Sequence, residues 1–178
     1  MKIRAVFIDR DGTLGGGSEI EYPGQFKMYP GAGEALLALN ESGRKIFAFT
    51  NQPGISARLS TQGAFKSELM EFGFDKAYIC PHQHGDGCRC RKPGAGILLR
   101  AAEEYSLPLE SCAVIGDRWT DMLPARQAGN SGILVKTGAG ASSLAKYKNR
   151  EYTGEWAFVH AGYIAVDLED AVQWILTK

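Results

Sequence analysis

The sequence predicts an α/β fold in which a mostly parallel central sheet is covered by helices on both faces. Short apolar runs typical of buried strands alternate with segments whose apolar residues recur at helical spacing. Three of the strand-like runs end in a polar residue, at Asp9, Thr50 and Asp117. In parallel sheets, ligands bind beyond the carboxyl ends of the strands. We therefore expect these three side chains, far apart in the sequence, to meet at one site.

The chain has 178 residues, which is most simply a single domain over residues 1–178 with a full hydrophobic core. Its 20 Lys and Arg residues balance 20 Asp and Glu residues. This balance provides no overall field for nucleic acid or an anionic membrane. No apolar run has the length of a signal peptide or a membrane span. These features predict a cytoplasmic protein with no nucleic-acid or membrane partner.

The N-terminal half begins with a β-branched and aromatic run over residues 6–8, which stops at the carboxylates that follow. Residues 15–30 contain three consecutive glycines and then a polar stretch, which predicts a long loop over the strand ends. The pattern then predicts a helix, a strand, a helix and a strand, in that order, over residues 31–42, 45–50, 60–72 and 75–80.

The C-terminal half continues the same alternation. The pattern predicts helices and strands in turn over residues 94–105, 112–115, 120–128 and 132–135. Residues 136–155 are rich in Gly and Ser, and we expect mostly loop there with at most one helical turn. An edge strand is expected within residues 158–166, followed by an amphipathic helix over 167–178.

Two carboxylates follow the first strand directly. If strand geometry persists, Asp9 and Asp11 project to the same side, about 6–7 Å apart. Two like charges this close are costly unless a cation lies between them or one carboxyl stays protonated. The ordinary alternative is a strand end whose acidic residues only cap a turn. With Asp117 as a third carboxylate, the set fits phosphoryl transfer through an aspartyl-phosphate.

In this interpretation each carboxylate has its own role. Asp9 attacks phosphorus, and Asp11 protonates the leaving oxygen and then deprotonates the water that clears the intermediate. Asp9, Asp117 and the backbone carbonyl of Asp11 are the expected ligands of Mg²⁺.

Four further residues complete the expected catalytic set. Thr50 and Asn51 can donate hydrogen bonds to phosphoryl oxygens, and Lys92 adds a fixed positive charge. Asp121, four residues after Asp117, either holds the Lys92 ammonium or favours a helix N-terminus. Taken singly, Thr50 is equally well a turn residue, Lys92 a solvated charge and Asp117 a helix N-cap.

These residues resemble the motifs of the haloacid dehalogenase-like phosphatase superfamily. Residues 9–13 match its first motif, Thr50 and Asn51 the second, Lys92 the third, and residues 116–121 the fourth. The resemblance implies a Rossmann-like three-layer sandwich and a Mg²⁺-dependent hydrolase. Members often insert a cap domain after the first or second motif, but neither gap here is long enough for one. An open site is therefore implied, with residues 15–29 as the substrate loop.

The segment 79–93 is similar to the marker of a small zinc-containing branch of this family. The resemblance implies that Cys80, His82, Cys88 and Cys90 hold a structural Zn²⁺ within a loop over residues 80–92, because four protein ligands leave no open position. The one-residue spacings oppose a local disulfide. A substitute ligand, His84, and a loop of free thiols are the alternatives. The fourth cysteine, Cys112, is expected to be a buried thiol.

The branch contains phosphatases of heptose bisphosphates and of histidinol phosphate, so the resemblance implies a small phosphorylated metabolite as substrate. It implies substrate contacts from Arg10, Asn51, Gln52 and Arg91. The patterns over 91–99 and 134–138 favour removal of the 7-phosphate of D-glycero-D-manno-heptose 1,7-bisphosphate.

Two features favour histidinol phosphate instead: the five residues between His82 and Cys88, and the segment 115–118. The first loop, with three glycines and no histidine, departs from both patterns. A nucleic-acid 3′-phosphatase and a non-enzymatic phosphoacceptor are the remaining alternatives. The neutral charge opposes the first, and Asp11 as a built-in acid and base opposes the second. Without a cap domain, a monomer is expected.

Overall fold

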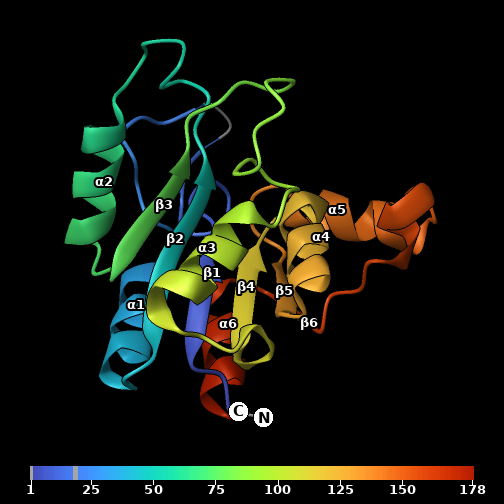
Figure 1. Cartoon of the computed structure of the whole chain (residues 1–178). Coiled ribbons are helices and arrows are strands. Elements are labelled where there is room, and N and C mark those ends of the chain that lie inside the picture. Colours follow the sequence, from blue (N-terminus) through green and yellow to red (C-terminus); the bar gives the residue numbers. More distant parts are fainter. Residues whose placement is uncertain (1, 18–19) are drawn as a thin grey trace.

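The computed structural model describes residues 2–17 and 20–178. Within these residues, six strands form one sheet in the order β3-β2-β1-β4-β5-β6, and every neighbouring pair is parallel (Figure 1). The strands are β1 (Ala5–Ile8), β2 (Lys45–Asn51), β3 (Lys76–Cys80), β4 (Cys112–Gly116), β5 (Ser131–Val135) and β6 (Tyr163–Ala165). The predicted α/β fold is confirmed.

Six α-helices connect and flank the strands in the described part of the chain. They are α1 (Ala32–Glu41), α2 (Gln62–Glu71), α3 (Gly96–Tyr105), α4 (Trp119–Ala128), α5 (Gly140–Lys148) and α6 (Leu168–Leu176). Two short 3₁₀ helices, η1 (Leu109–Ser111) and η2 (Gly154–Phe158), complete the elements. None of the described helices has the length and apolar character needed to cross a lipid bilayer.

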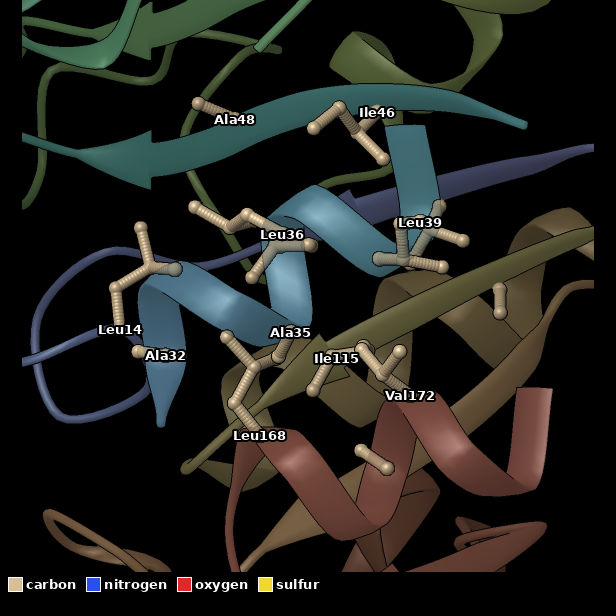
Figure 2. Packing of buried hydrophobic residues seen from close by; sticks show 14 of the residues in the cluster. Leu14, Ala32, Ala35, Leu36, Leu39, Ile46, Ala48, Ile115, Leu168 and Val172 are labelled. Atoms are coloured by element: carbon tan, nitrogen blue, oxygen red, sulfur yellow. The ribbon is translucent and has the colours of Figure 1, made fainter. Parts of the chain in front are cut away.

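The central strands β1 and β4 are buried on both faces, which gives the fold three layers. In β1, Val6 and Ile8 join the core beneath α1 and α6, whereas Phe7 joins the core on the other face, beneath α3 and α4. Alternate residues of a strand point to opposite faces, so a run without polar residues is required for burial on both. Figure 2 shows α1 and α6 on the first face, with Leu36 and Val172 among the packed side chains.

The region after β5 differs from the sequence prediction. Residues 136–155 were expected to be mostly loop, but α5 occupies nine of them. This helix has few apolar residues of its own, and Leu144 and Tyr147 pack against a cluster that contains Trp119 and Leu123 of α4. Packing against another element, rather than the local pattern, therefore stabilises α5.

The parallel arrangement brings all the strand ends that carry polar residues to one edge of the sheet. Figure 1 shows the loops that follow β2 and β3 standing above this edge. The substrate loop predicted over residues 15–29 also begins here, and its ends lie side by side, since Gly16 N donates to Lys27 O at 3.0 Å and Tyr29 N to Leu14 O at 2.8 Å. Residues 18–19 of this loop lie outside the described residues. No separate cap domain is evident in the described part of the chain.

Candidate active site

Three buried carboxylates converge at the carboxyl ends of β1 and β4. One carboxylate oxygen from each of Asp9, Asp117 and Asp121 lies within 4.8 Å of the other two. The exposed fractions of these residues are 6%, 1% and 0%. Buried anions at this separation are stable only when cations compensate them. The cluster therefore requires positive charge from the protein or from a bound ion.

Lys92 brings a positive charge from the protein into direct contact with this carboxylate cluster. Its Nζ lies 2.7 Å from Asp9 Oδ1 and 2.5 Å from Asp121 Oδ1, and it donates to Phe49 O at 2.9 Å. Burial alone would lower the pKa of Lys92, but the carboxylates of Asp121 and Asp9 outweigh it and raise the pKa. Lys92 thus remains charged, yet one ammonium cannot neutralise three carboxylates.

Asp117 carries the clearest sign that a metal ion belongs in this site. Its Oδ2 accepts a hydrogen bond from Ala139 N at 2.7 Å, whereas its buried Oδ1 has no hydrogen-bond partner among the described residues. Arg118 Nε lies 3.9 Å from Oδ1, beyond hydrogen-bond distance. Burial, with the carboxylates of Asp9 and Asp121, raises the pKa of Asp117 to about 7. An unpartnered buried oxygen beside Asp9 fits a hard divalent cation such as Mg²⁺.

Asp121 is engaged on both of its carboxylate oxygens. Oδ1 contacts Lys92, and Oδ2 accepts a hydrogen bond from Arg118 N at 3.0 Å, at the start of α4. Both roles considered from the sequence, holding the ammonium and favouring the helix N-terminus, are present in these contacts. Asp121 therefore supports Lys92, and Asp9 and Asp117 are the better-placed carboxylate ligands for a metal ion.

Both carboxylate oxygens of Asp11 bind side chains outside the three-carboxylate cluster. Its Oδ1 accepts a hydrogen bond from Arg10 Nη1 at 2.6 Å, and its Oδ2 accepts one from Gln52 Nε2 at 2.5 Å. The chain turns directly after Asp11 at Gly12, where φ is 84°. β1 itself ends at Ile8, and Asp11 nevertheless lines the same cavity as Asp9. Burial raises the pKa of Asp11, although the Arg10 cation opposes this effect.

Arg10 is placed differently from the sequence-based expectation of substrate contact. Its side chain is fully buried, and Nε and Nη2 donate to Glu68 Oε1 at 2.9 and 2.7 Å. The reason is that Glu68 of α2 supplies a buried carboxylate within reach of the guanidinium. A buried guanidinium paired in this way is not available to a substrate.

Asn51 and Gln52 likewise bind protein groups. Asn51 Oδ1 accepts from Lys92 N at 3.0 Å, and its Nδ2 donates to Lys92 O at 3.3 Å. Gln52 Nε2 donates to Thr50 Oγ1 at 3.1 Å in addition to its contact with Asp11. In this structure the two amides therefore position the expected catalytic side chains.

Two cavities flank the cluster. The first, of about 590 Å³, lies between the substrate loop and the site and is lined by Asp11, Gln52 and Asp117, with loop residues that include Tyr22. The second, of about 500 Å³, is lined by twelve residues: Asp9, Asp11, Thr50, Asn51, Pro53, His84, Arg91, Lys92, Pro93, Arg118, Thr120 and Trp156. Four side chains were expected to bind substrate. Of these, Arg91 lines the second cavity, which contains Asp9, and its side chain makes no direct contact with an expected catalytic residue.

Trp156 and Arg118 line the second cavity but are absent from the sequence-based site. Trp156 lies in η2, directly after the segment 136–155 that was expected to be mostly loop, and its backbone carbonyl accepts a hydrogen bond from Trp119 Nε1 at 3.2 Å. Arg118 lines both cavities. For Trp156, the available signal in the sequence was a tryptophan in a polar, Gly-containing segment. For Arg118, the signal was that it directly follows Asp117.

The side chains of Cys80, His82, Cys88 and Cys90 form a second cluster, above the end of β3. Their ligand atoms lie within 4.8 Å of one another, and the three sulfur atoms are 3.3–3.7 Å apart. These separations are much longer than a disulfide bond and close to the ~3.8 Å expected between sulfurs around a tetrahedral Zn²⁺. Burial raises the pKa of Cys80 to about 12, so a thiolate there needs a cation nearby. The four side chains fit Zn²⁺.

The chain matches a family model along most of its length. Residues 16–129 match the model of the haloacid dehalogenase-like hydrolases, and residues 89–170 match a second, HAD-hydrolase-like model. The chain belongs to the haloacid dehalogenase-like hydrolases. The two matches cover Asp117 and Asp121, which follow β4, and begin after Asp9 and Asp11.

Named relatives of this haloacid dehalogenase-like hydrolase are phosphatases. The D-glycero-beta-D-manno-heptose-1,7-bisphosphate 7-phosphatase of Bordetella bronchiseptica is 31% identical over 81% of this chain and 87% of its own length. The enzyme of the same name from Pseudomonas putida is 34% identical over 81% of this chain and 89% of its own length. This hydrolase is a phosphatase.

A solved structure is similar over almost the whole hydrolase. It is the D,D-heptose 1,7-bisphosphate phosphatase from B. bronchiseptica complexed with magnesium and phosphate, with a TM-score of 0.82, 28% sequence identity and coverage of 99% of both chains. The magnesium in that relative agrees with the hard-cation site inferred here from Asp9 and Asp117.

Proposed function

We propose that this phosphatase is Mg²⁺-dependent and removes the 7-phosphate of D-glycero-D-manno-heptose 1,7-bisphosphate through an aspartyl-phosphate. The observation that carries the reaction type is that Asp9 contacts the ammonium of Lys92 and shares a cluster with Asp117, whose Oδ1 has no partner among the described residues. The substrate assignment rests on the names of two relatives. The match to this chain spans more than four-fifths of the length of each relative.

The first half-reaction uses Asp9 as nucleophile and Asp11 as acid. A carboxylate oxygen of Asp9 forms a bond to phosphorus as the bond from phosphorus to the sugar oxygen breaks, and Asp11 gives its proton to that oxygen. Lys92 holds Asp9 in place and stabilises the charge on the phosphoryl group. Bound Mg²⁺ would be held by Asp9, Asp117 and the backbone carbonyl of Asp11, and it supplies positive charge against the repulsion between two anions.

The second half-reaction restores the enzyme. A water molecule attacks phosphorus and transfers a proton to Asp11, the bond between phosphorus and Asp9 breaks, and inorganic phosphate leaves. Asp9 is then again a carboxylate and Asp11 again carries a proton. Every side chain and backbone group named in the two half-reactions comes from one chain, so the proposal needs no second subunit.

We further propose that Cys80, His82, Cys88 and Cys90 hold a structural Zn²⁺. Support comes from the separations of their ligand atoms and from the chain order, because Cys90 directly precedes Arg91 and Lys92. Arg91 Nη1 also donates to His82 O at 3.0 Å, which ties the substrate-facing arginine to the same loop. Thiolate ligands persist in a reducing compartment, which supports a cytoplasmic location.

The direct test is phosphate release by the purified protein with Mg²⁺, comparing kcat/KM for the heptose bisphosphate and for histidinol phosphate. Asp9→Asn, which keeps the shape of the side chain and loses the nucleophile, is the blank. A large preference for the heptose bisphosphate supports the proposal. Preference for histidinol phosphate, which the short stretch between His82 and Cys88 favours, would overturn the substrate assignment. Activity that Asp9→Asn retains would overturn the mechanism.

A further inference from the structure

We propose that Arg10 is a positioning residue that fixes one oxygen of Asp11 and links it, through Glu68, to the substrate loop. The inference rests on the proposed function, because it assigns Asp11 the exchange of a proton with the substrate oxygen. It concerns Arg10 and Glu68, neither of which lines the two cavities described above.

All three guanidinium nitrogens of Arg10 donate hydrogen bonds. Nε and Nη2 contact Glu68 Oε1, and Nη1 contacts both Asp11 Oδ1 at 2.6 Å and the backbone carbonyl of Glu21 at 3.0 Å. The guanidinium is planar and always charged, so these donors have fixed directions relative to one another. One buried cation therefore joins the end of β1, α2 and the substrate loop.

Two aromatic rings cover the faces of the guanidinium. Phe26 of the substrate loop lies 3.7 Å from the guanidinium carbon, measured to the ring centroid, and Phe65 of α2 lies at 5.0 Å. Contacts of this kind favour a cation over the ring face. Because the hydrogen bonds fix the plane and the rings fix its faces, Arg10 has little freedom to rotate away from Asp11.

Glu68 extends the link to a second point of the substrate loop. Its Oε1 accepts both hydrogen bonds from Arg10, and its Oε2 accepts one from Gly24 N at 3.2 Å. Glu68 is 9% exposed, so it needs a partner charge, which Arg10 provides. The loop residues Glu21, Gly24 and Phe26 are thus all held by the Arg10–Glu68 pair.

The two oxygens of Asp11 therefore have different partners. Oδ1 is held by a buried permanent cation, whereas Oδ2 is held by the neutral amide of Gln52 at the wall of the 590 Å³ cavity. An oxygen that accepts from a guanidinium has no place for a proton along that contact. Oδ2 is consequently the oxygen that gives a proton to the sugar oxygen and later takes one from water. For this exchange, the hydrogen bond from Gln52 Nε2 to Oδ2 must break or lengthen.

The test compares two phosphate esters with Arg10→Lys, which keeps the charge and loses the fork of donors. An alkyl phosphate such as the heptose bisphosphate needs a proton on its leaving oxygen, and p-nitrophenyl phosphate does not. We expect kcat/KM for the heptose bisphosphate to fall about 100-fold, the lower range of acid catalysis, and kcat/KM for p-nitrophenyl phosphate to fall less than about threefold. Equal losses with both esters would overturn the proposal.

Two further variants keep the proposal testable if Arg10→Lys folds poorly. Glu68→Gln keeps the size of the side chain and removes its charge. We expect kcat/KM for the heptose bisphosphate again to fall more than kcat/KM for p-nitrophenyl phosphate, but by a smaller factor than in Arg10→Lys. Arg44→Lys is the matched control, since Arg44 donates to the backbone carbonyls of Ile3 and Ile175 at the opposite end of the sheet. Arg44→Lys should change kcat/KM for both esters by the same factor. A wild-type protein inactive on both esters would overturn the proposed function, whereas equal losses from an active wild type overturn this inference alone.

Discussion

The side-chain amide of Asn51 binds the backbone of Lys92 at two points, accepting from its N–H at 3.0 Å and donating to its carbonyl at 3.3 Å. The end of β2 is thereby fastened to the residue that neutralises Asp9. Lys92 lies on a loop that follows β3, so its position depends on contacts of this kind and not on a strand or helix of its own.

We expect Asn51→Ala to lower kcat/KM about 30-fold, because two hydrogen bonds worth about 1 kcal/mol each no longer hold Lys92. The loss should appear mainly in kcat, since Lys92 acts on the phosphoryl group during the reaction. Steady-state kinetics of the purified variant give the answer. Asn40→Ala is the control, because Asn40 Nδ2 binds Gly73 O on the surface at 3.1 Å. A variant of Asn51 with unchanged kinetics contradicts the positioning role.

Lys92→Met should destabilise the protein as well as inactivate it. Asp9 and Asp121 lose their common buried cation, and breaking a buried ion pair on one side typically costs about 3–5 kcal/mol. The free energy of unfolding from urea denaturation measures this effect. Lys45→Met removes the exposed partner of Asp75 and should cost less than about 1 kcal/mol. Similar costs for the two variants would show that Lys92 does not compensate the buried carboxylates.

Binding of Mg²⁺ should weaken as the pH falls. Burial and two neighbouring carboxylates raise the pKa of Asp117 to about 7, and the group binds a cation only when it is ionised. Below that pH the metal ion must displace a proton, which lowers its apparent affinity by up to about tenfold per pH unit. Calorimetric titration in two buffers of different ionisation enthalpy counts the protons released. An affinity that stays constant between pH values of about 8 and about 6 contradicts this account.

Cys88→Ser should lose zinc, stability and activity together, because the loop that carries Lys92 loses one of its four ligands. Zinc content by atomic emission, the melting temperature and kcat/KM are measured on the same preparation. Cys112→Ser is the control, since this buried thiol of β4 lies apart from the Cys/His cluster and donates to Pro108 O at 3.4 Å. A Cys88→Ser protein that is stable and fully active would refute the link between the metal and the site.

Chelation of zinc should expose Cys88 and Cys90 to alkylation and leave Cys80 and Cys112 protected. Cys88 and Cys90 are partly exposed and become free thiols on metal removal. Burial raises the pKa of Cys80 to about 12 and that of Cys112 to about 11, which keeps both thiols protonated and unreactive at pH values near 8. Mass spectrometry after iodoacetamide treatment identifies the modified residues. Alkylation of Cys112 at the same rate as Cys88 would contradict its placement in the core.

The sequence was sufficient for the sheet and for the residues at its strand ends. Asp9, Thr50 and Asp117 each follow an uninterrupted apolar run, and parallel strands necessarily bring such ends to one edge. The helix α5 could not be predicted in the same way, because its stability depends on Trp119 and Leu123 of another element. Local pattern carries no information on a partner that is distant in the sequence.

The roles of polar side chains were harder to predict than their location. Arg10 belongs to the first motif and Gln52 directly follows the second, and the family resemblance assigned both to the substrate. In the structure they hold Asp11, because burial requires each polar group to find a protein partner and the nearest partner is the carboxylate itself. A motif marks where the chemistry occurs, and contacts between side chains decide which of its members touch the substrate.

The arrangement of the Cys/His loop would allow the exposed stretch over residues 83–87 to vary while Lys92 keeps a fixed position. With Zn²⁺ bound as we propose, its four ligands would fix both ends of the exposed stretch over residues 83–87, while Lys92 lies beyond Cys90. On that basis we expect residues within 83–87 to tolerate insertion, deletion or exchange while the ammonium remains in register with Asp9. Diversification of this stretch, in evolution or in a designed library, can retune which phosphate esters are accepted at little cost to the turnover machinery.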